Sequence, residues 1–158
     1  MPRERVQALM REIGPIADLA AVGEHEGIDV WTLVTDEEGS IVDAELDAAR
    51  GCLVLTAELG PLGPAGRAGR MELMLRYNDQ WQETEGARLA LGAPEGPVML
   101  LADHPVEGMG VGELARRVRV FAGMAQAWRE LLAAAPAGDG APDASAGLSL
   151  LGRGMIRG

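Results

Sequence analysis

The segment from Met71 to Leu132 contains the most regular hydrophobic pattern in this chain of 158 residues. From residue 111 onward, apolar side chains recur in steps of four, three, four, three and four residues. They are Leu114, Val118, Phe121, Ala125, Trp128 and Leu132. This spacing places them along one face of an α-helix. We therefore expect a long amphipathic helix over residues 111–135.

A second helix is expected over about residues 70–81. Its apolar side chains cover most of its circumference, which is typical of a helix that is buried on more than one side. In a domain this small, two-sided burial indicates a subunit interface as much as an internal core, and twofold dimers are by far the commonest oligomers. We predict a homodimer with Leu73, Met74, Tyr77 and Trp81 at its interface.

Three strand-like runs precede that helix, at residues 28–34, 41–46 and 52–59. Turn-like links separate them, which favours antiparallel hairpins. Two more strands are expected between the helices, at 87–91 and 97–101. The sequence therefore predicts an α+β domain with an antiparallel sheet of about five strands and three helices, in the order helix, three strands, helix, two strands, helix.

The N-terminal residues 3–13 predict the remaining helix, and Gly14–Pro15 should end it because proline cannot continue the hydrogen-bond ladder. Its apolar stripe consists of Val6, Leu9, Met10 and Ile13. Two interpretations stay open. The stripe covers the sheet, or part of it is an exposed docking surface, since methionine-containing apolar patches adapt to varied partners.

The domain is expected to span residues 1–135, and residues 136–158 form an Ala/Gly/Pro-rich tail of the kind that is flexible. The tail also contains apolar residues, which leaves open whether it is only a spacer. They are Leu148, Leu150, Leu151, Met155 and Ile156.

The formal charge of −10 argues against nucleic acid and anionic membranes as partners. All 14 basic residues are arginines, and 24 acidic residues are spread among them. No apolar run approaches the roughly 18 residues that a membrane span needs, and the first residues lack the apolar core of a signal peptide. We expect a soluble cytosolic protein without membrane insertion.

Signals for catalysis are poor. His25 lies between two glutamates, His104 lies in a short polar loop sequence, and neither is tied by spacing to a nucleophile or a set of metal ligands. The glycine-rich segments lack a phosphate-binding motif. We predict no catalytic residue, no metal and no cofactor, and keep a small hydrolase or ligand-binding protein using His104 as an alternative.

The order of these elements, over about residues 3–134, resembles the class I type III secretion chaperones. Short sequences strengthen the likeness: Leu-Gly at 59–60 after a strand, a helix ending near Asn78, Gly-Ala-Arg-Leu-Ala-Leu at 86–91, and Trp-Arg at 128–129. The Pro/Gly-rich stretch at 60–69 and the long tail depart from the family pattern, which leaves the local geometry there and the role of the tail open.

The resemblance implies a bacterial cytoplasmic homodimer without enzymatic activity. It would bind the N-terminal segment of a type III effector and keep it soluble and competent for secretion, with the export ATPase as a further candidate partner. We place the effector contact at Val6, Leu9, Met10 and Ile13 and on the early strands. The alternative is a binding or scaffold module of the same fold that does not serve secretion.

Overall fold

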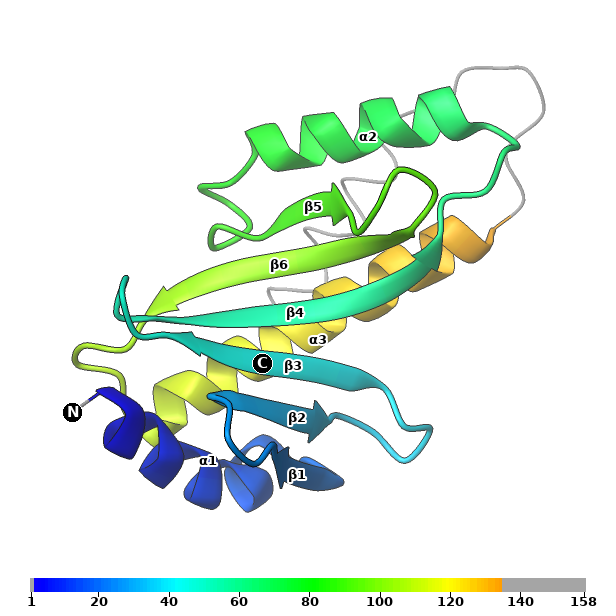
Figure 1. Ribbon diagram of the computed structural model, residues 1–158. Helices are drawn as coiled ribbons and strands as arrows, with labels where there is room; N and C mark the ends of the chain where they lie inside the picture. The colour runs from blue at the N-terminus through cyan, green and yellow to red at the C-terminus, as the bar shows by residue number, and fades with distance from the viewer. Residues whose placement is uncertain (1, 135–158) are drawn as a thin grey trace. The chain divides into compact units, whose positions relative to one another are not determined.

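The computed structural model describes residues 2–134, which form three helices and a six-stranded antiparallel sheet (Figure 1). The α+β class and the order of the predicted elements are confirmed, with one strand more than expected. The strand order across the sheet is β1-β2-β3-β4-β6-β5. The elements are α1 (Pro2–Ala17), β1 (Ala21–Glu24), β2 (Val30–Val34), β3 (Ile41–Asp47), β4 (Cys52–Pro61), α2 (Arg67–Asp79), β5 (Arg88–Leu91), β6 (Pro97–Pro105) and α3 (Val111–Ala133).

The chain divides into two compact units. The first comprises residues 1–57 and 101–122, and the second, within the described residues, comprises 58–100 and 123–134. A single domain over residues 1–135 stays a prediction, and the predicted tail at 136–158 lies outside the described residues.

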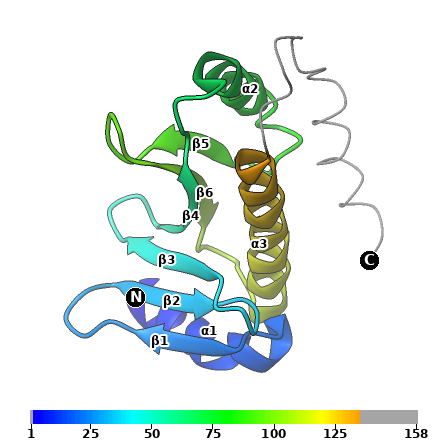
Figure 2. The ribbon, with the colours of Figure 1, turned by 90° about the vertical axis from the view of Figure 1, so that its right-hand side faces the viewer.

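In the first unit, β2 pairs with β1 on one side and β3 on the other, both antiparallel. Along β3 buried and exposed residues alternate strictly, so that one face of the sheet carries the core. Trp31 and Leu33 of β2 point to that face and are buried. The first half of α3 lies along this face, and Figure 2 shows it beside the strands.

Strand β1 was not predicted. Its four residues, Ala-Val-Gly-Glu, are mostly exposed, and they include a glycine and no alternation of buried and exposed positions. Sequence periodicity detects a strand through the core that it faces, and β1 hardly faces one. Its extended form follows from pairing with β2, from Ala21 opposite Val34 to Glu24 opposite Trp31.

The predicted end of the first helix at Gly14–Pro15 is wrong, because α1 continues to Ala17. Pro15 removes only the bond to the carbonyl of Arg11, which is an exposed residue near the helix end. The helix ends where Asp18 adopts a left-handed conformation with φ of 57°. The amide of Leu19 then donates to the carbonyl of Gly14 at 2.9 Å, as in a Schellman motif.

In the second unit, α2 begins three residues before the predicted start and ends two residues before the predicted end, so Trp81 lies beyond the helix. Tyr77 packs against Trp128 of α3, with the ring centroids 5.2 Å apart and the rings nearly perpendicular. The Tyr77 hydroxyl donates to the sulfur of Met124 at 3.2 Å. This aromatic contact is the centre of the core on the inner side of α2.

Asn78, at the end of α2, holds β5 against the helix. Its amide nitrogen donates to the carbonyl of Leu89 at 3.0 Å, and the amide of Leu89 donates to its Oδ1 at 2.7 Å. The side chain thus pairs with the backbone of β5 much as a neighbouring strand does.

Candidate functional site

A groove of about 520 Å³ lies between α1 and β1 in the first unit. Its lining includes apolar side chains from α1, the following turn and two strands, and three polar side chains. The apolar part consists of Met10, Pro15, Leu19, Ala20, Ala21, Val22 and Trp31, and the polar part of Gln7, Arg11 and Glu24. An apolar hollow with a few polar groups is the usual form of a binding site in proteins.

The strand that borders this groove, β1, is one edge of the sheet. An edge strand presents backbone N–H and C=O groups that no neighbouring strand pairs, and such an edge can accept an added strand from a partner. An extended peptide could therefore bond to the backbone of β1 while its apolar side chains enter the groove.

Two of the three polar side chains of the groove are hydrogen-bonded to each other. The Gln7 amide of α1 donates to Oε1 of Glu24 on β1 at 3.0 Å. Arg11 lies one helical turn after Gln7 and is exposed. The groove thus presents a hydrogen-bonding glutamine, a carboxylate and a guanidinium beside an apolar wall, a set that suits a peptide and includes no evident nucleophile.

The four residues predicted for effector contact, Val6, Leu9, Met10 and Ile13, are all buried in the folded chain. Their burial agrees with the interpretation in which the stripe covers the sheet. Met10 alone also lines the groove. A role for these four in effector binding stays a prediction, and the exposed groove residues beside them are the more accessible candidates.

The residues predicted for the dimer interface fall on different sides of α2. Met74 and Tyr77 are buried and Leu73 is half-buried, whereas Trp81 is 59% exposed. Met71 and Leu75, which were not singled out, are 40% and 69% exposed. Their spacing of four residues places them on one side of the helix, and this was the signal that the sequence offered. The dimer contact itself stays a prediction.

Neither histidine lies in the groove. His25, on the loop after β1, contacts the hydroxyl of Thr32 through its Nε2 at 2.9 Å, and that hydroxyl donates to Asp43 at 2.7 Å. His104 is buried at the end of β6, where Nη1 of Arg117 lies 2.7 Å from its Nδ1. Within residues 2–134, no three His, Cys, Asp or Glu side chains gather so that they could hold a metal ion.

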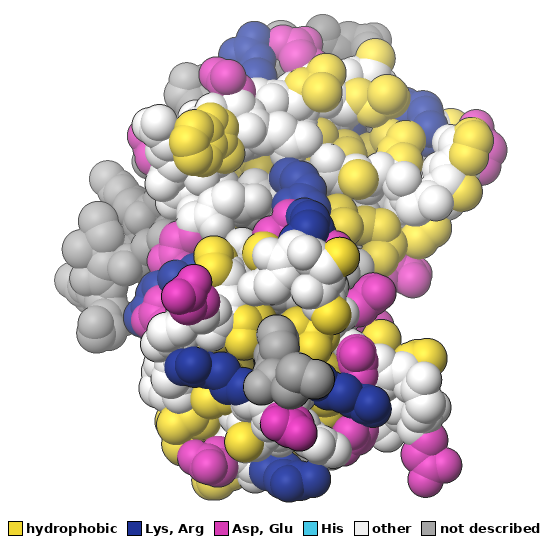
Figure 3. All heavy atoms as spheres, turned by 60° about the vertical axis from the view of Figure 1, so that its left-hand side comes forward, with side chains coloured by type: hydrophobic (Ala, Val, Ile, Leu, Met, Phe, Trp, Pro, Cys, Tyr) yellow, Lys and Arg dark blue, Asp and Glu magenta, His cyan; other side chains and the backbone are white. Residues whose placement is uncertain are grey.

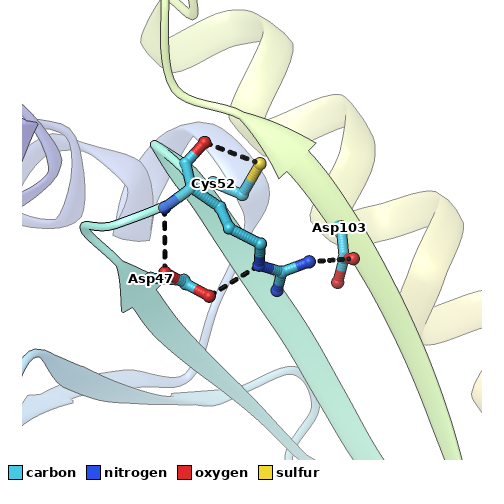
Figure 4. Close-up of polar contacts among 4 residues, drawn as sticks. Asp47, Cys52 and Asp103 are labelled. Atoms are coloured by element: carbon cyan, nitrogen blue, oxygen red, sulfur yellow. Dashed lines mark hydrogen bonds and ion pairs between the residues drawn. The ribbon is translucent and has the colours of Figure 1, made fainter.

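A polar cluster at the turn between β3 and β4 has a structural explanation (Figure 4). The Arg50 guanidinium donates to Asp47 at 2.6 Å and to Asp103 of β6 at 2.9 Å, which raises the pKa of Arg50. The hydrogen bonds from Arg50 lower the pKa of Asp47. The thiol of Cys52, which is only half-buried, donates to the Arg50 carbonyl at 3.5 Å. These contacts fix the turn against β6.

The surface carries no continuous basic stripe on the face that Figure 3 shows, where apolar, acidic and arginine side chains are interspersed. A nucleic-acid site would gather arginines on one face. Among the described residues, no helix has the length and the hydropathy needed to cross a membrane.

Chains of three solved complexes share this fold. A chain of the HopA1–SchA chaperone–effector complex aligns with a TM-score of 0.66 and 16% identity, over 81% of this chain and 95% of that chain. A chain of the ExsC–ExsE complex aligns with a TM-score of 0.67 and 21% identity, over 82% of this chain and 94% of that chain. The third structure is the Yersinia pestis type III secretion chaperone SycH in complex with a stable fragment of YscM2. A chain of that complex aligns with a TM-score of 0.57 and 18% identity, over 75% of this chain and 95% of that chain. No family model and no curated protein sequence matches the chain.

Proposed function

We propose that this chain is a type III secretion chaperone, which binds the N-terminal segment of an effector in the bacterial cytoplasm and keeps it soluble and competent for secretion. The observation that carries the proposal is the groove beside an edge strand, in a fold shared with chains of chaperone–effector complexes. No step of this function needs a catalytic group or a cofactor, and the export ATPase is a further candidate partner.

The effector segment would bind as an extended strand along β1. Backbone groups of β1 would supply affinity that does not depend on the effector sequence, and the apolar groove would select side chains at alternate positions. Glu24 and the net charge of −10 favour segments that are basic or neutral. Ordering such a segment costs conformational entropy, which the burial of its apolar side chains offsets.

Capture of a co-expressed effector tests the groove. Val22 is half-buried, lines the groove and belongs to the short edge strand, so Val22→Asp places a charge in the apolar wall with little effect on the core. We expect this variant to lose effector affinity at least tenfold in a pull-down titration. Val111→Asp is the matched control, because Val111 is also a half-buried valine but lies in the first turn of α3 and does not line the groove. Unchanged capture by Val22→Asp would contradict the proposal.

We propose further that two chains form a homodimer through the outer side of α2. Met71 and Leu75 on α2 and Trp81 just beyond its end are exposed apolar side chains, and groups of such side chains tend to mark interfaces. Leu73 borders them, whereas Met74 and Tyr77 would support the helix from inside. A self-complementary contact of one helix with its copy fits twofold symmetry.

Light scattering coupled to size-exclusion chromatography tests the dimer. We expect a mass of twice 16.6 kDa at micromolar concentration, and a shift toward 16.6 kDa for Leu75→Asp. Ile28→Asp is the control, since Ile28 is 54% exposed in the first unit. A wild-type chain that stays monomeric would refute the dimer and leave the groove proposal intact.

A further inference from the structure

The outer side of α2 exposes apolar side chains to water when the chain is alone. Three of the six large apolar side chains that the described residues expose lie on α2 or just beyond its end, and we refer to these three, Met71, Leu75 and Trp81, as the α2 face. A second copy covers this face only above the dissociation constant of the dimer. Below it, contact with water is unfavourable, at roughly 25 cal/mol per Å² of apolar surface.

The last described residues place the start of the remaining chain beside this helix. Nη2 of Arg70, in the first turns of α2, donates to the carbonyl of Ala134 at 2.8 Å, and Nη1 of the same residue donates to the carbonyl of Leu62 at 2.7 Å. The chain after residue 134 therefore starts next to the N-terminal end of α2.

The sequence beyond that point has two parts. Residues 135–146 are alanine, glycine, proline, aspartate and serine, and residues 148–158 read Leu-Ser-Leu-Leu-Gly-Arg-Gly-Met-Ile-Arg-Gly. Twelve residues can span up to roughly 40 Å. The 13 residues of α2 measure about 20 Å. The second part can therefore reach any position along the α2 face.

Charge also favours this contact. Residues 148–158 contain two arginines and no acidic residue, while Asp79 and Glu83 lie at the far end of α2 beside Trp81. A segment that runs along α2 away from Ala134 brings Arg153 and Arg157 toward these carboxylates. The five apolar residues of the segment match the apolar character of the face.

We propose that residues 148–158 bind the α2 face of their own chain in competition with a second copy. The segment would shield Trp81 in the monomer and would be displaced when two chains pair. The inference rests on the proposed dimer contact and deepens it. On dimerisation, a second copy would replace the segment 148–158 on the same apolar face.

The fluorescence of Trp81 reports the contact directly. Trp31 and Trp128 are 2% and 0% exposed, so acrylamide reaches mainly Trp81. The test compares the full wild-type chain with Leu150→Asp/Leu151→Asp, diluted until light scattering gives the mass of one chain. We expect an acrylamide quenching constant at least twofold higher in the variant. Ala144→Asp/Ser145→Asp adds the same two charges without removing leucines and should behave like the wild type.

Equal quenching in the wild type and the leucine variant would overturn the inference. So would a wild-type chain that stays dimeric at every concentration, because the segment would then never displace a copy. We also expect the leucine variant to dimerise at about tenfold lower concentration, and unchanged or weaker dimerisation would count against the competition. Effector capture by the same variants is measured separately, so its failure refutes the chaperone function and leaves the Trp81 result standing.

Discussion

At the residue scale, Glu113 in the first turn of α3 illustrates that the pKa of a partly exposed side chain can change when the chain folds. Its carboxylate accepts hydrogen bonds from Nε of Arg116 at 3.1 Å and from Nε of Arg117 at 2.7 Å. Hydrogen bonds from Arg116 and then Arg117 lower the pKa of Glu113 to about 2. The N-terminal end of a helix also favours a negative charge.

The shift determines the pH range in which Glu113 stabilises the fold. An unfolded glutamate titrates near pH 4.3. A depressed folded pKa contributes stability that is complete above this value and is lost as pH falls toward about 2. We expect Glu113→Gln to unfold at lower urea than the wild type at pH 7, with the difference shrinking between pH 5 and 2. Glu130→Gln, also exposed on α3, is the control; a difference that is constant with pH would contradict the assignment.

At this scale the sequence predicts which residues share a face when the element has only one buried side. The alternation in the sequence groups Trp31 and Leu33 on one face of their strand, because a strand has only two faces, and the structure adds that this face is the buried one. The same reasoning failed on α2, where apolar residues surround the helix. Met74 and Leu75 are adjacent and both apolar, yet Met74 is 6% exposed and Leu75 69% exposed, because only one side of the helix faces the core that contains Tyr77 and Trp128.

At the scale of elements, the pairing of α2 with β5 depends on the Asn78 side chain. Asn78→Asp keeps the acceptor for the Leu89 amide but loses the donor, so that a carboxylate faces the Leu89 carbonyl. We expect the free energy of unfolding to fall by about 1 kcal/mol, the usual net contribution of one hydrogen bond, because the Asn78 side chain is only half-buried. Urea titration measures this. The neighbouring change Asp79→Asn is on an exposed residue and should have little effect; equal losses in both would exclude the pairing role.

Elements were predictable from sequence when their own residues carried the signal. The long helix α3 was recognised from its apolar steps to within two residues of its end. The strand β1 and the last turn of α1 were missed because they depend on partners. Pairing with β2 makes residues 21–24 a strand, and Ala17, which is buried, continues the helix past Pro15. The candidate groove is lined by β1 and by the last turn of α1, the two parts that were not predicted, so the sequence alone did not reveal it.

At the scale of the whole molecule, the charge of −10 opposes association of two copies. If the α2 faces pair, the apolar contact must exceed this repulsion, which salt screens over about 10 Å at 0.1 M ionic strength. We expect the dimer dissociation constant to decrease as sodium chloride rises from 20 to 200 mM, on the order of a few-fold for such screening. Sedimentation equilibrium measures it. A dimer that weakens with salt would point to an ionic interface instead.

The hydrogen bond between Thr32 and Asp43 determines which nitrogen of the neighbouring His25 ring carries the proton. A hydroxyl has one proton, and Thr32 gives it to the carboxylate, so it can only accept from His25. The neutral imidazole of His25 must therefore carry its proton on Nε2, although free histidine samples both tautomers. Nitrogen chemical shifts of the ring should show this single form, and Thr32→Val should release the ring to exchange between the two.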